Sequence, residues 1–379
     1  ESSEAESSEA ESEAESSEDM GDDACYRYQV MEQDGKDSCY IDSVIFAMFV
    51  GDSPFMNSMV DKQINQSDTL ICPSAVQRQK LGRMKAAIHS AADKVEARAN
   101  LAAYLERYGA KDLERRENIQ EQLRLIRNSI HRRGPHVNIC TDLRREMKYC
   151  YSPEEFHRRG TKDAVEFLTY ILKLFETPST AVTRTTTWVT DDVKTPMDEL
   201  IEEKPDNLYE TSAIVNRKGD IVQTVSLFKI IDGQPRSLDE FLLSDTDTLF
   251  EDEDDYMAWN HDRWPRKISK DEVVSAPYLI FAVQRKDFDG NVIETVTSPP
   301  PIIELPNGSI FDLKAIVTHK HQHYTAYFLC GENWYFYNDL DAANSDQAIH
   351  YRGSGDNMGD WSPNPLTRGV LYFYEPISL

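Results

Sequence analysis

The sequence of 379 residues predicts an α+β fold in which helices come first and an antiparallel sheet follows. Apolar residues recur at helical spacing up to about position 175, whereas β-branched and aromatic runs separated by turn residues begin at 181. Hydrophobic residues make up 40% of the chain, which is enough for a substantial core. We therefore expect one large folded domain with a helical first half and a sheet-rich second half.

The first 23 residues are a low-complexity tract of Glu, Ser and Ala. They hold eleven Asp or Glu residues and no Lys or Arg. Such a tract has too few apolar groups to offset the entropy lost on ordering, so it predicts a disordered, solvating tail. Its serines lie beside acids and would suit an acid-directed kinase. The predicted organisation is a disordered tail over 1–23 and a folded domain over 24–379.

Helical spacing marks three parts of the first half. An apolar run within 37–60 begins just after Cys39, and residues 76–131 are rich in Ala, Leu, Arg, Glu and Gln. Gly109 divides two apolar faces of that long stretch, so we expect it to break the stretch into two helices. A further helix is predicted over 164–175.

Strand-like runs follow in the second half, at residues 181–189, 221–231, 278–284 and 310–318. Glycine-containing turn signals separate them, which favours hairpins and an antiparallel sheet. The acidic run 251–255 predicts a surface loop, although it could also blunt a sheet edge or meet a basic substrate.

Charge and hydropathy exclude two classes of partner. The net charge is −25, and the chain beyond residue 23 still carries −14, so nucleic acid is not expected as a direct partner. No apolar stretch approaches the roughly 20 residues that span a membrane.

The cysteines form no recognisable framework. Six are scattered without C-x-x-C pairs, whereas zinc ribbons need paired spacings and small disulfide scaffolds are denser. We therefore expect free thiols in a reducing intracellular setting, cytoplasmic or nuclear. The first residues are Glu and Ser rather than basic and then apolar, which does not indicate a secretory signal.

Two distant segments suggest nucleophilic chemistry. Cys39 lies at the predicted start of a helix, where the macrodipole and backbone N–H groups favour a thiolate. Far along the chain, two alternating runs on either side of a turn at 331–333 predict a hairpin that brings Asn338 or Asp339 beside His323. An imidazole oriented in this way could take the proton of a thiol nucleophile.

A metal site is the competing interpretation of the same segment. His319, His321 and His323 are spaced at i, i+2 and i+4, so on one strand they would share a face and could bind zinc. No paired cysteines and no second shell of ligands lie nearby in the sequence.

Three motifs in order resemble the ubiquitin-specific protease family of papain-like cysteine peptidases. DSCYIDSVIFAMF at 37–49 is similar to the family's Cys box, and its Ser38 and Asp42 variant is closest to the cylindromatosis-type branch. TKDAVEFLTYIL at 161–172 is similar to the acidic helix motif, and HYTAYFLCGENWYFYND at 323–339 to the His box. The resemblance implies a papain-like domain with a helical thumb and an antiparallel-sheet palm and fingers.

The resemblance also implies residue roles. Cys39 would be the nucleophile, His323 the general base and Asn338 the orienting residue, with Asp339 as helper or substitute. Asp163 and Glu166 fall where the family grips the basic tail of ubiquitin. The resemblance therefore implies that these two carboxylates bind the substrate.

The implied reaction is hydrolysis of the bond after the C-terminal glycine of ubiquitin, with ubiquitin chains and ubiquitinated proteins as partners and no cofactor. No structural zinc is expected, because 180–280 lacks the paired cysteines of many relatives. Asp34 stands where the family has an oxyanion-binding Asn, so Gln33 is a candidate donor. Two alternatives follow: a catalytically weak ubiquitin-binding module of the same fold, or a protease for another ubiquitin-like modifier.

Overall fold

A computed structural model describes the greater part of the chain. The described residues are 25, 28, 31–32, 37–51, 53–91, 93–131, 138–158, 160, 162–177, 180–190, 193–196, 223–225, 228–230, 236–238, 243–249, 266–286, 291–305, 307–341 and 348–377. The tail predicted to be disordered and the acidic run 251–255 lie outside these residues.

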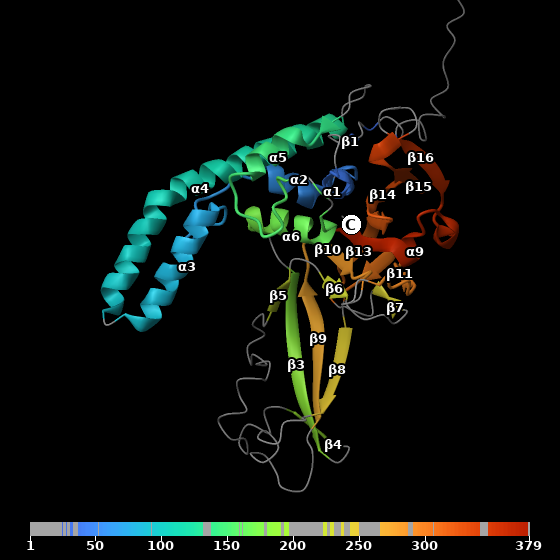
Figure 1. Cartoon of the computed structure of the whole chain (residues 1–379). Coiled ribbons are helices and arrows are strands. Elements are labelled where there is room, and N and C mark those ends of the chain that lie inside the picture. The colour runs from blue at the N-terminus through green and yellow to red at the C-terminus, as the bar shows by residue number, and fades with distance from the viewer. Residues whose placement is uncertain are drawn as a thin grey trace, which may run out of the picture.

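Helices and an antiparallel sheet form the two halves that the sequence predicts, so the α+β class is confirmed (Figure 1). The helices are α1 (Cys39–Phe49), α2 (Pro54–Asp61), α3 (Ala75–Ser90), α4 (Lys94–Ile130), α5 (Thr141–Met147), α6 (Ala164–Leu174) and α9 (Pro365–Arg368), with short 3-10 turns η5 (Asp339–Asp341) and η7 (Met358–Asp360).

An eight-stranded sheet carries the second half, in the order β16-β15-β14-β13-β17-β10-β6 with β12 paired to β13. Its strands are β6 (Phe228–Ile230), β10 (Leu279–Val283), β12 (Ile302–Glu304), β13 (Ile310–Lys320), β14 (His323–Cys330), β15 (Asn333–Tyr337), β16 (Ile349–Gly353) and β17 (Gly369–Pro376). All its pairs are antiparallel except β6 with β10.

A second, five-stranded antiparallel sheet extends away from the helices and the main sheet (Figure 1). It contains β3 (Thr180–Thr190), β4 (Val193–Pro196), β5 (Gln223–Val225), β8 (Leu243–Leu249) and β9 (Arg266–Ser275). Two short parallel pairs also occur among the described residues, β1 (Met31–Glu32) with β2 (Asn138–Ile139) and β7 (Arg236–Ser237) with β11 (Thr297–Ser298).

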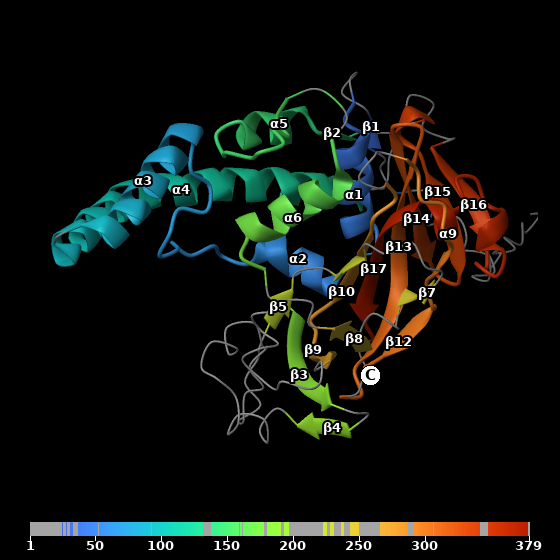
Figure 2. The same cartoon turned by 60° about the horizontal axis from the view of Figure 1, so that its bottom comes forward.

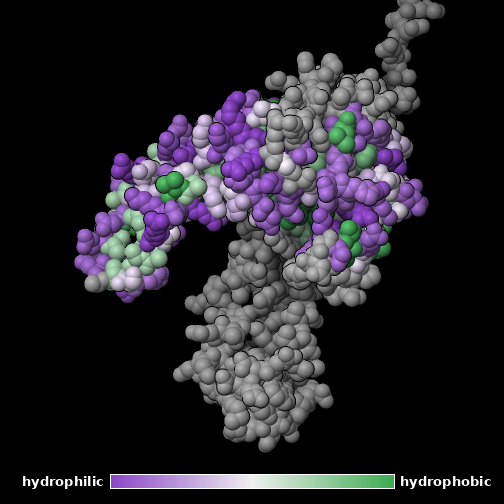
Figure 3. All heavy atoms as spheres, viewed as in Figure 1, coloured by the Kyte–Doolittle hydropathy of each residue, from purple (hydrophilic) through white to green (hydrophobic). Residues whose placement is uncertain are grey.

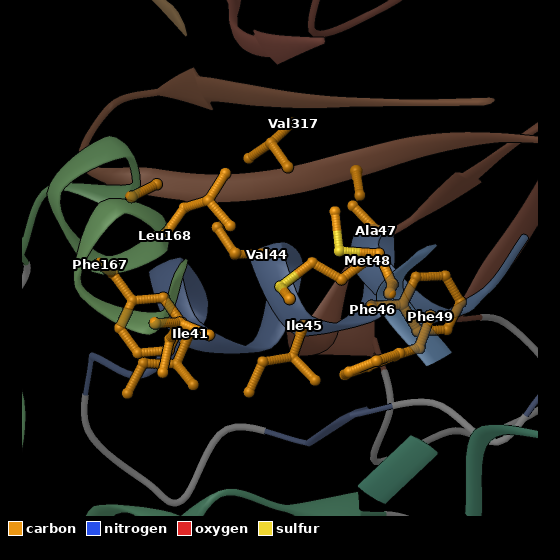
Figure 4. Packing of buried hydrophobic residues seen from close by; sticks show 14 of the residues in the cluster. Ile41, Val44, Ile45, Phe46, Ala47, Met48, Phe49, Phe167, Leu168 and Val317 are labelled. Atoms are coloured by element: carbon orange, nitrogen blue, oxygen red, sulfur yellow. The ribbon is translucent and has the colours of Figure 1, made fainter. Parts of the chain in front are cut away.

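The central helix α1 lies between the other helices and the main sheet (Figure 2). All its residues are buried, as expected for a helix that is apolar on nearly every face. Figure 4 shows α1 side chains between Phe167 and Leu168 of α6 and Val317 of β13. The ring of Phe46 also stacks on Tyr337 of β15, with centroids 4.1 Å apart. Burial of each such side chain stabilises the fold by about 1.5–3 kcal/mol, so the start of α1 is rigidly placed.

Both faces of the main sheet are buried. Alternate residues of β17 show this: Leu371 and Phe373 join the core under the helices, whereas Tyr372 and Tyr374 join a second core on the far face. The far core is closed by Trp361 and neighbouring segments. The strands that carry the candidate site residues are therefore held from both sides.

Gly109 does not separate two helices, so that prediction is wrong. It lies inside α4, where the side chain of Gln66 occupies the space that a Cβ would need. The glycine allows a close approach and leaves the helix intact. The break falls instead near Asp93, whose carboxylate caps α4 by accepting two backbone N–H hydrogen bonds at 2.8 and 3.1 Å.

The run 221–231 is likewise not one strand. It holds β5 and β6, which belong to different sheets, and β6 pairs parallel to β10. The sequence reasoning also did not separate α2, which starts at a Ser53-Pro54 cap, from α1.

The α3–α4 hairpin reaches outward from the body of the protein (Figure 1). Its outer surface is largely hydrophilic (Figure 3). A small cluster around Leu81 and Tyr104 holds the two helices together. Among the described residues no single helix could cross a membrane; α1 and α2 reach that length and composition only together, across a bend of 109°.

Four cysteines are paired, which corrects the expectation of free thiols. Cys25 is bonded to Cys330 at the end of β14, and Cys72 to Cys150. The partners are 305 and 78 residues apart, so their pairing depends on the tertiary fold and leaves no local spacing pattern in the sequence. Cys39 and Cys140 are not in disulfides.

Candidate active site

Cys39 is the first residue of α1, as predicted. The chain enters the helix through Asp37, whose φ of +55° is in the left-handed region, and the Asp37 carbonyl accepts a 3.2 Å hydrogen bond from Arg144. The Ser38 carbonyl accepts the first backbone hydrogen bonds of the helix, at 2.7 and 3.0 Å. Cys39 is therefore held on a tight turn at the helix start, with only 3% of it exposed.

His323 and Asn338 meet as the predicted hairpin requires. His323 begins β14 and Asn338 follows β15, and the two strands pair antiparallel across a turn at Gly331. Nε2 of His323 lies 2.7 Å from Oδ1 of Asn338 and 3.4 Å from Oδ1 of the buried Asp339. Both predicted neighbours of the imidazole are confirmed in position, and Asn338 is the closer one.

A second turn brings the imidazole strand to Cys39. His321 and Gln322 have φ of +50° and +65°, a conformation that costs free energy in residues other than glycine. This turn joins β13 to β14 and places the Gln322 carbonyl oxygen 4.0 Å from Sγ of Cys39. The start of α1 and the start of β14 are therefore adjacent, although 283 residues separate them.

The same turn removes the geometry behind the zinc interpretation. His319 lies on β13 and His323 on β14, so the three histidines do not share one face of a single strand. His319 stacks instead on the ring of Tyr324, with centroids 4.3 Å apart. Burial, and then the charge of Lys286, lowers the pKa of His319 to about 4. No metal-binding group of three or more such side chains occurs within the described residues.

The pKa of the Cys39 thiol is higher than its position at the start of a helix predicts. The pKa of Cys39 is raised to about 12, chiefly by burial, and the carboxyls of Asp339 and Asp42 act in the same direction. The backbone N–H groups of Tyr324 and Tyr40 act in the opposite direction but do not outweigh burial. The expected thiolate is therefore not favoured at rest, because desolvation and two acids oppose the helix terminus.

A buried acidic pair lies beneath Cys39. Asp42 is fully buried and accepts a 2.5 Å hydrogen bond from the Ser38 hydroxyl. Burial, and then the neighbouring carboxyl of Asp339, raises the pKa of Asp42 well above its usual range. Hydrogen bonds from Ser38 and Cys140 lower it only in part. Burial and the neighbouring Asp339 thus favour the protonated form of Asp42.

Replacing Asp42 by asparagine is expected to stabilise the protein at pH 7, because burial and Asp339 raise the pKa of the Asp42 carboxyl in the folded chain and an amide at this position does not ionise. The unfolded chain releases the Asp42 proton near pH 4, but the folded chain keeps it to higher pH. The stability that Asp42 contributes is therefore lost as pH rises from about 4 toward its raised pKa. Urea unfolding at pH 4 and pH 7 measures this: the gain of Asp42→Asn should grow with pH, and an equal gain at both values would contradict it.

Asp163 and Glu166 occupy different surroundings at the start of α6. Asp163 is the N-cap: its carboxylate accepts the backbone N–H groups of Val165 and Glu166 at 2.7 and 3.0 Å. It also lies close enough to influence His319 and Tyr324. Glu166 is exposed and lines a cavity of about 620 Å³ between α6, α3 and residues 151–156.

Tyr324 and Asp341 are site neighbours that the sequence reasoning missed. Tyr324 follows His323 in the chain, and its side chain lies against Ala164 at the start of α6. Asp341 accepts a 2.9 Å hydrogen bond from Nδ2 of Asn338. The sequence signal for Asp341 was its position three residues after Asn338, which allows a local side-chain hydrogen bond. Gln33 and Asp34 lie outside the described residues.

Comparison of the sequence with known protein families and curated proteins finds no relative. No model of a known protein family matches the chain, and no curated protein is similar to it at a significant level.

Proposed function

We propose that this protein is a thiol-dependent deubiquitinating protease that hydrolyses the bond after the C-terminal glycine of ubiquitin. The observation that carries the proposal is the 2.7 Å contact between His323 and Asn338, beside a cysteine at the start of a buried helix. A papain-like fold, with the helices as thumb and the two sheets as palm and fingers, is part of the proposal. Its support is the order of the three motifs and their convergence at one site.

The proposed reaction uses the two nitrogens of His323 differently. Nε2 donates to Oδ1 of Asn338, which leaves Nδ1 as the base for the Cys39 proton. The sulfur then attacks the carbonyl carbon of the C-terminal glycine of ubiquitin, the bond from that carbon to the amine breaks, and the imidazolium gives its proton to the leaving amine. Water activated by the same imidazole hydrolyses the thioester and releases ubiquitin. The Cys39 backbone N–H at the helix start is the proposed oxyanion donor, alongside Gln33.

The raised pKa of Cys39 means that His323 must take the proton during the reaction and that substrate must reach a buried sulfur. Only 3% of Cys39 is exposed. We therefore propose that binding of the ubiquitin tail moves the left-handed His321–Gln322 turn, whose Gln322 carbonyl oxygen lies 4.0 Å from the sulfur.

A catalytically weak ubiquitin-binding module is the second candidate, and the pKa of about 12 is what favours it. The two candidates differ in turnover. Full-length protein and its Cys39→Ala variant should be incubated with di-ubiquitins of each linkage. Cleavage by the wild type alone supports the protease, whereas binding of the chains without cleavage supports the module.

The modifier itself is tested with a panel of C-terminal fluorogenic amides of ubiquitin and ubiquitin-like proteins. The proposal expects the highest kcat/KM for ubiquitin, because Asp163 and Glu166 present carboxylates to its basic tail. A higher kcat/KM for another modifier would show that this modifier, and not ubiquitin, is the substrate. The proposed reaction at Cys39 would be unchanged.

The proposed partners are ubiquitin chains and ubiquitinated proteins. An intracellular location would suit them, but the expectation of a reducing compartment rested on free thiols. Disulfides persist in oxidising surroundings. The cysteines, four of which are paired, therefore no longer support that expectation.

The role proposed for Asp163 can be separated from its capping role. Asp163→Ala should lose about 1 kcal/mol of stability with the cap, whereas Asp163→Asn keeps an accepting oxygen and should not. Both variants should raise KM for ubiquitin substrates about threefold to tenfold through loss of the charge. Asp93→Ala, which removes the equivalent cap of α4, is the matched control for stability without a change in KM. A normal KM in Asp163→Asn would refute a binding role.

A further inference from the structure

We propose that Asp341 is a positioning residue that fixes the side-chain amide of Asn338, so that its oxygen and not its nitrogen faces His323. The inference rests on the proposed function and adds a fourth residue to the site. It also gives a physical reason for asparagine at position 338.

The amide of Asn338 is held at both ends. Its nitrogen donates to Oδ2 of Asp341 at 2.9 Å, and its oxygen lies 2.7 Å from Nε2 of His323. The same oxygen accepts the backbone N–H of Leu340 at 3.3 Å. The 3-10 turn η5 sets this geometry, because the backbone N–H of Asp341 donates to the Asn338 carbonyl at 3.1 Å. The carboxylate is thereby placed beside the amide of the residue three positions earlier.

A primary amide has nearly the same shape in its two orientations, so shape alone does not choose between them. The flipped amide would direct its oxygen at the carboxylate of Asp341, and its nitrogen at the N–H of Leu340. A carboxylate can only accept hydrogen bonds and a backbone N–H can only donate, so both contacts would become repulsive. Asp341 and the Leu340 N–H together therefore select one orientation.

The selected orientation decides which nitrogen of His323 is the base. An oxygen at Asn338 accepts from Nε2–H and leaves the lone pair on Nδ1, the nitrogen not bound to Asn338. A nitrogen there would donate to Nε2 and move the proton to Nδ1, which would then be unable to accept the proton of Cys39. Loss of Asp341 would thus populate an inactive tautomer.

Asp341 is itself held from the neighbouring strand. Nε2 of His350 on β16 lies 3.5 Å from Oδ2 of Asp341. Asp339, by contrast, is buried and lies on the imidazole itself at 3.4 Å. The two acids of η5 therefore act differently: Asp339 lies against His323, and Asp341 acts through Asn338.

A double-mutant cycle tests the inference. Asp341→Ala should lower kcat/KM about tenfold to 100-fold, the scale known for groups that orient metal-binding histidines, with little change in KM. Asp341→Asn keeps an accepting oxygen and should recover part of the loss. Asp356→Ala, which removes an exposed carboxylate from the loop after β16, is the matched control and should leave activity unchanged.

The discriminating step uses Asp at position 338. A carboxylate there has no nitrogen to misplace, and it would lie against Asp341. In an Asn338→Asp background, Asp341→Ala should therefore have no effect or raise activity. An equal loss in both backgrounds would show a merely structural role and overturn the inference, as would normal activity of Asp341→Ala in the Asn338 background.

Alkylation of Cys39 by iodoacetamide provides a readout that needs no ubiquitin, so it separates this inference from the proposed function. Asp341→Ala should slow alkylation at neutral pH about tenfold or more, and the Asn338→Asp background should abolish that effect. If the wild type does not cleave ubiquitin but alkylation still follows the cycle, the positioning role holds and the proposed substrate fails. If alkylation does not respond to Asp341→Ala, the positioning role fails whatever the substrate.

Discussion

Replacing His323 by alanine is expected to slow the reaction of Cys39 at pH 7 by roughly 10³–10⁴-fold, the scale of a lost general base in a nucleophile–base pair. The reason is the buried thiol, whose pKa is raised to about 12. A group with that pKa is ionised in only about one molecule in 10⁵ at pH 7. Without an imidazole to take the proton, almost no nucleophile is available.

The pH dependence separates this explanation from a general loss of structure. In His323→Ala the logarithm of the alkylation rate should rise by about one per pH unit from 7 to 10, because ionisation of the thiol becomes the only route. The wild-type rate should depend less steeply on pH, because His323 takes the proton of the thiol. His89→Ala, an exposed histidine on α3, is the control. A wild-type rate in His323→Ala, or the same slope in both proteins, would contradict the proposed base.

Removing the Cys72–Cys150 disulfide by a double substitution to serine is expected to cost about 4 kcal/mol of unfolding free energy, from the chain entropy of a loop of 78 residues. The bond joins the segment before α3 to the segment after α5, where Tyr151 also donates a 2.8 Å backbone hydrogen bond to Pro73. These segments form part of the wall of the cavity that Glu166 lines. Denaturant unfolding of the variant and the wild type measures the loss.

Thiol counting provides the matching chemical test. The denatured, unreduced chain should expose two reactive thiols, Cys39 and Cys140, and the reduced chain six. Cys140→Ala should remove one thiol and leave both disulfides in place. Six thiols before reduction would show that the pairs do not form, and would restore the expectation of a reducing compartment.

Local patterns predicted the parts of the fold whose causes are local. The helix over 164–175 and the strand over 310–318 follow from periodicity, and the structure has α6 and β13 there. The contact of His323 with Asn338 was also predictable, because both residues belong to one short β-hairpin, formed by β14 and β15. These features depend on residues that are close in sequence.

Features that depend on distant residues were missed. Gly109 lies within the continuous helix α4, and the side chain of Gln66, 43 positions away, fills the space beside it. The approach of Cys39 to the Gln322 turn spans 283 residues, and neither segment alone contains a local pattern that fixes it. The protonated state of Cys39 follows from burial and from Asp339, neither of which the helix-start pattern contains. Tertiary packing decided each of these.

The most direct test of the proposed function is covalent trapping with ubiquitin that carries an electrophile at its C-terminus. The full-length wild type should gain the mass of one ubiquitin, at Cys39 by peptide mapping, and His323→Ala should react far more slowly. Cys39→Ala should form no adduct. The absence of an adduct on the wild type, under conditions that trap a known deubiquitinase, or an adduct that persists in Cys39→Ala, would contradict the proposal.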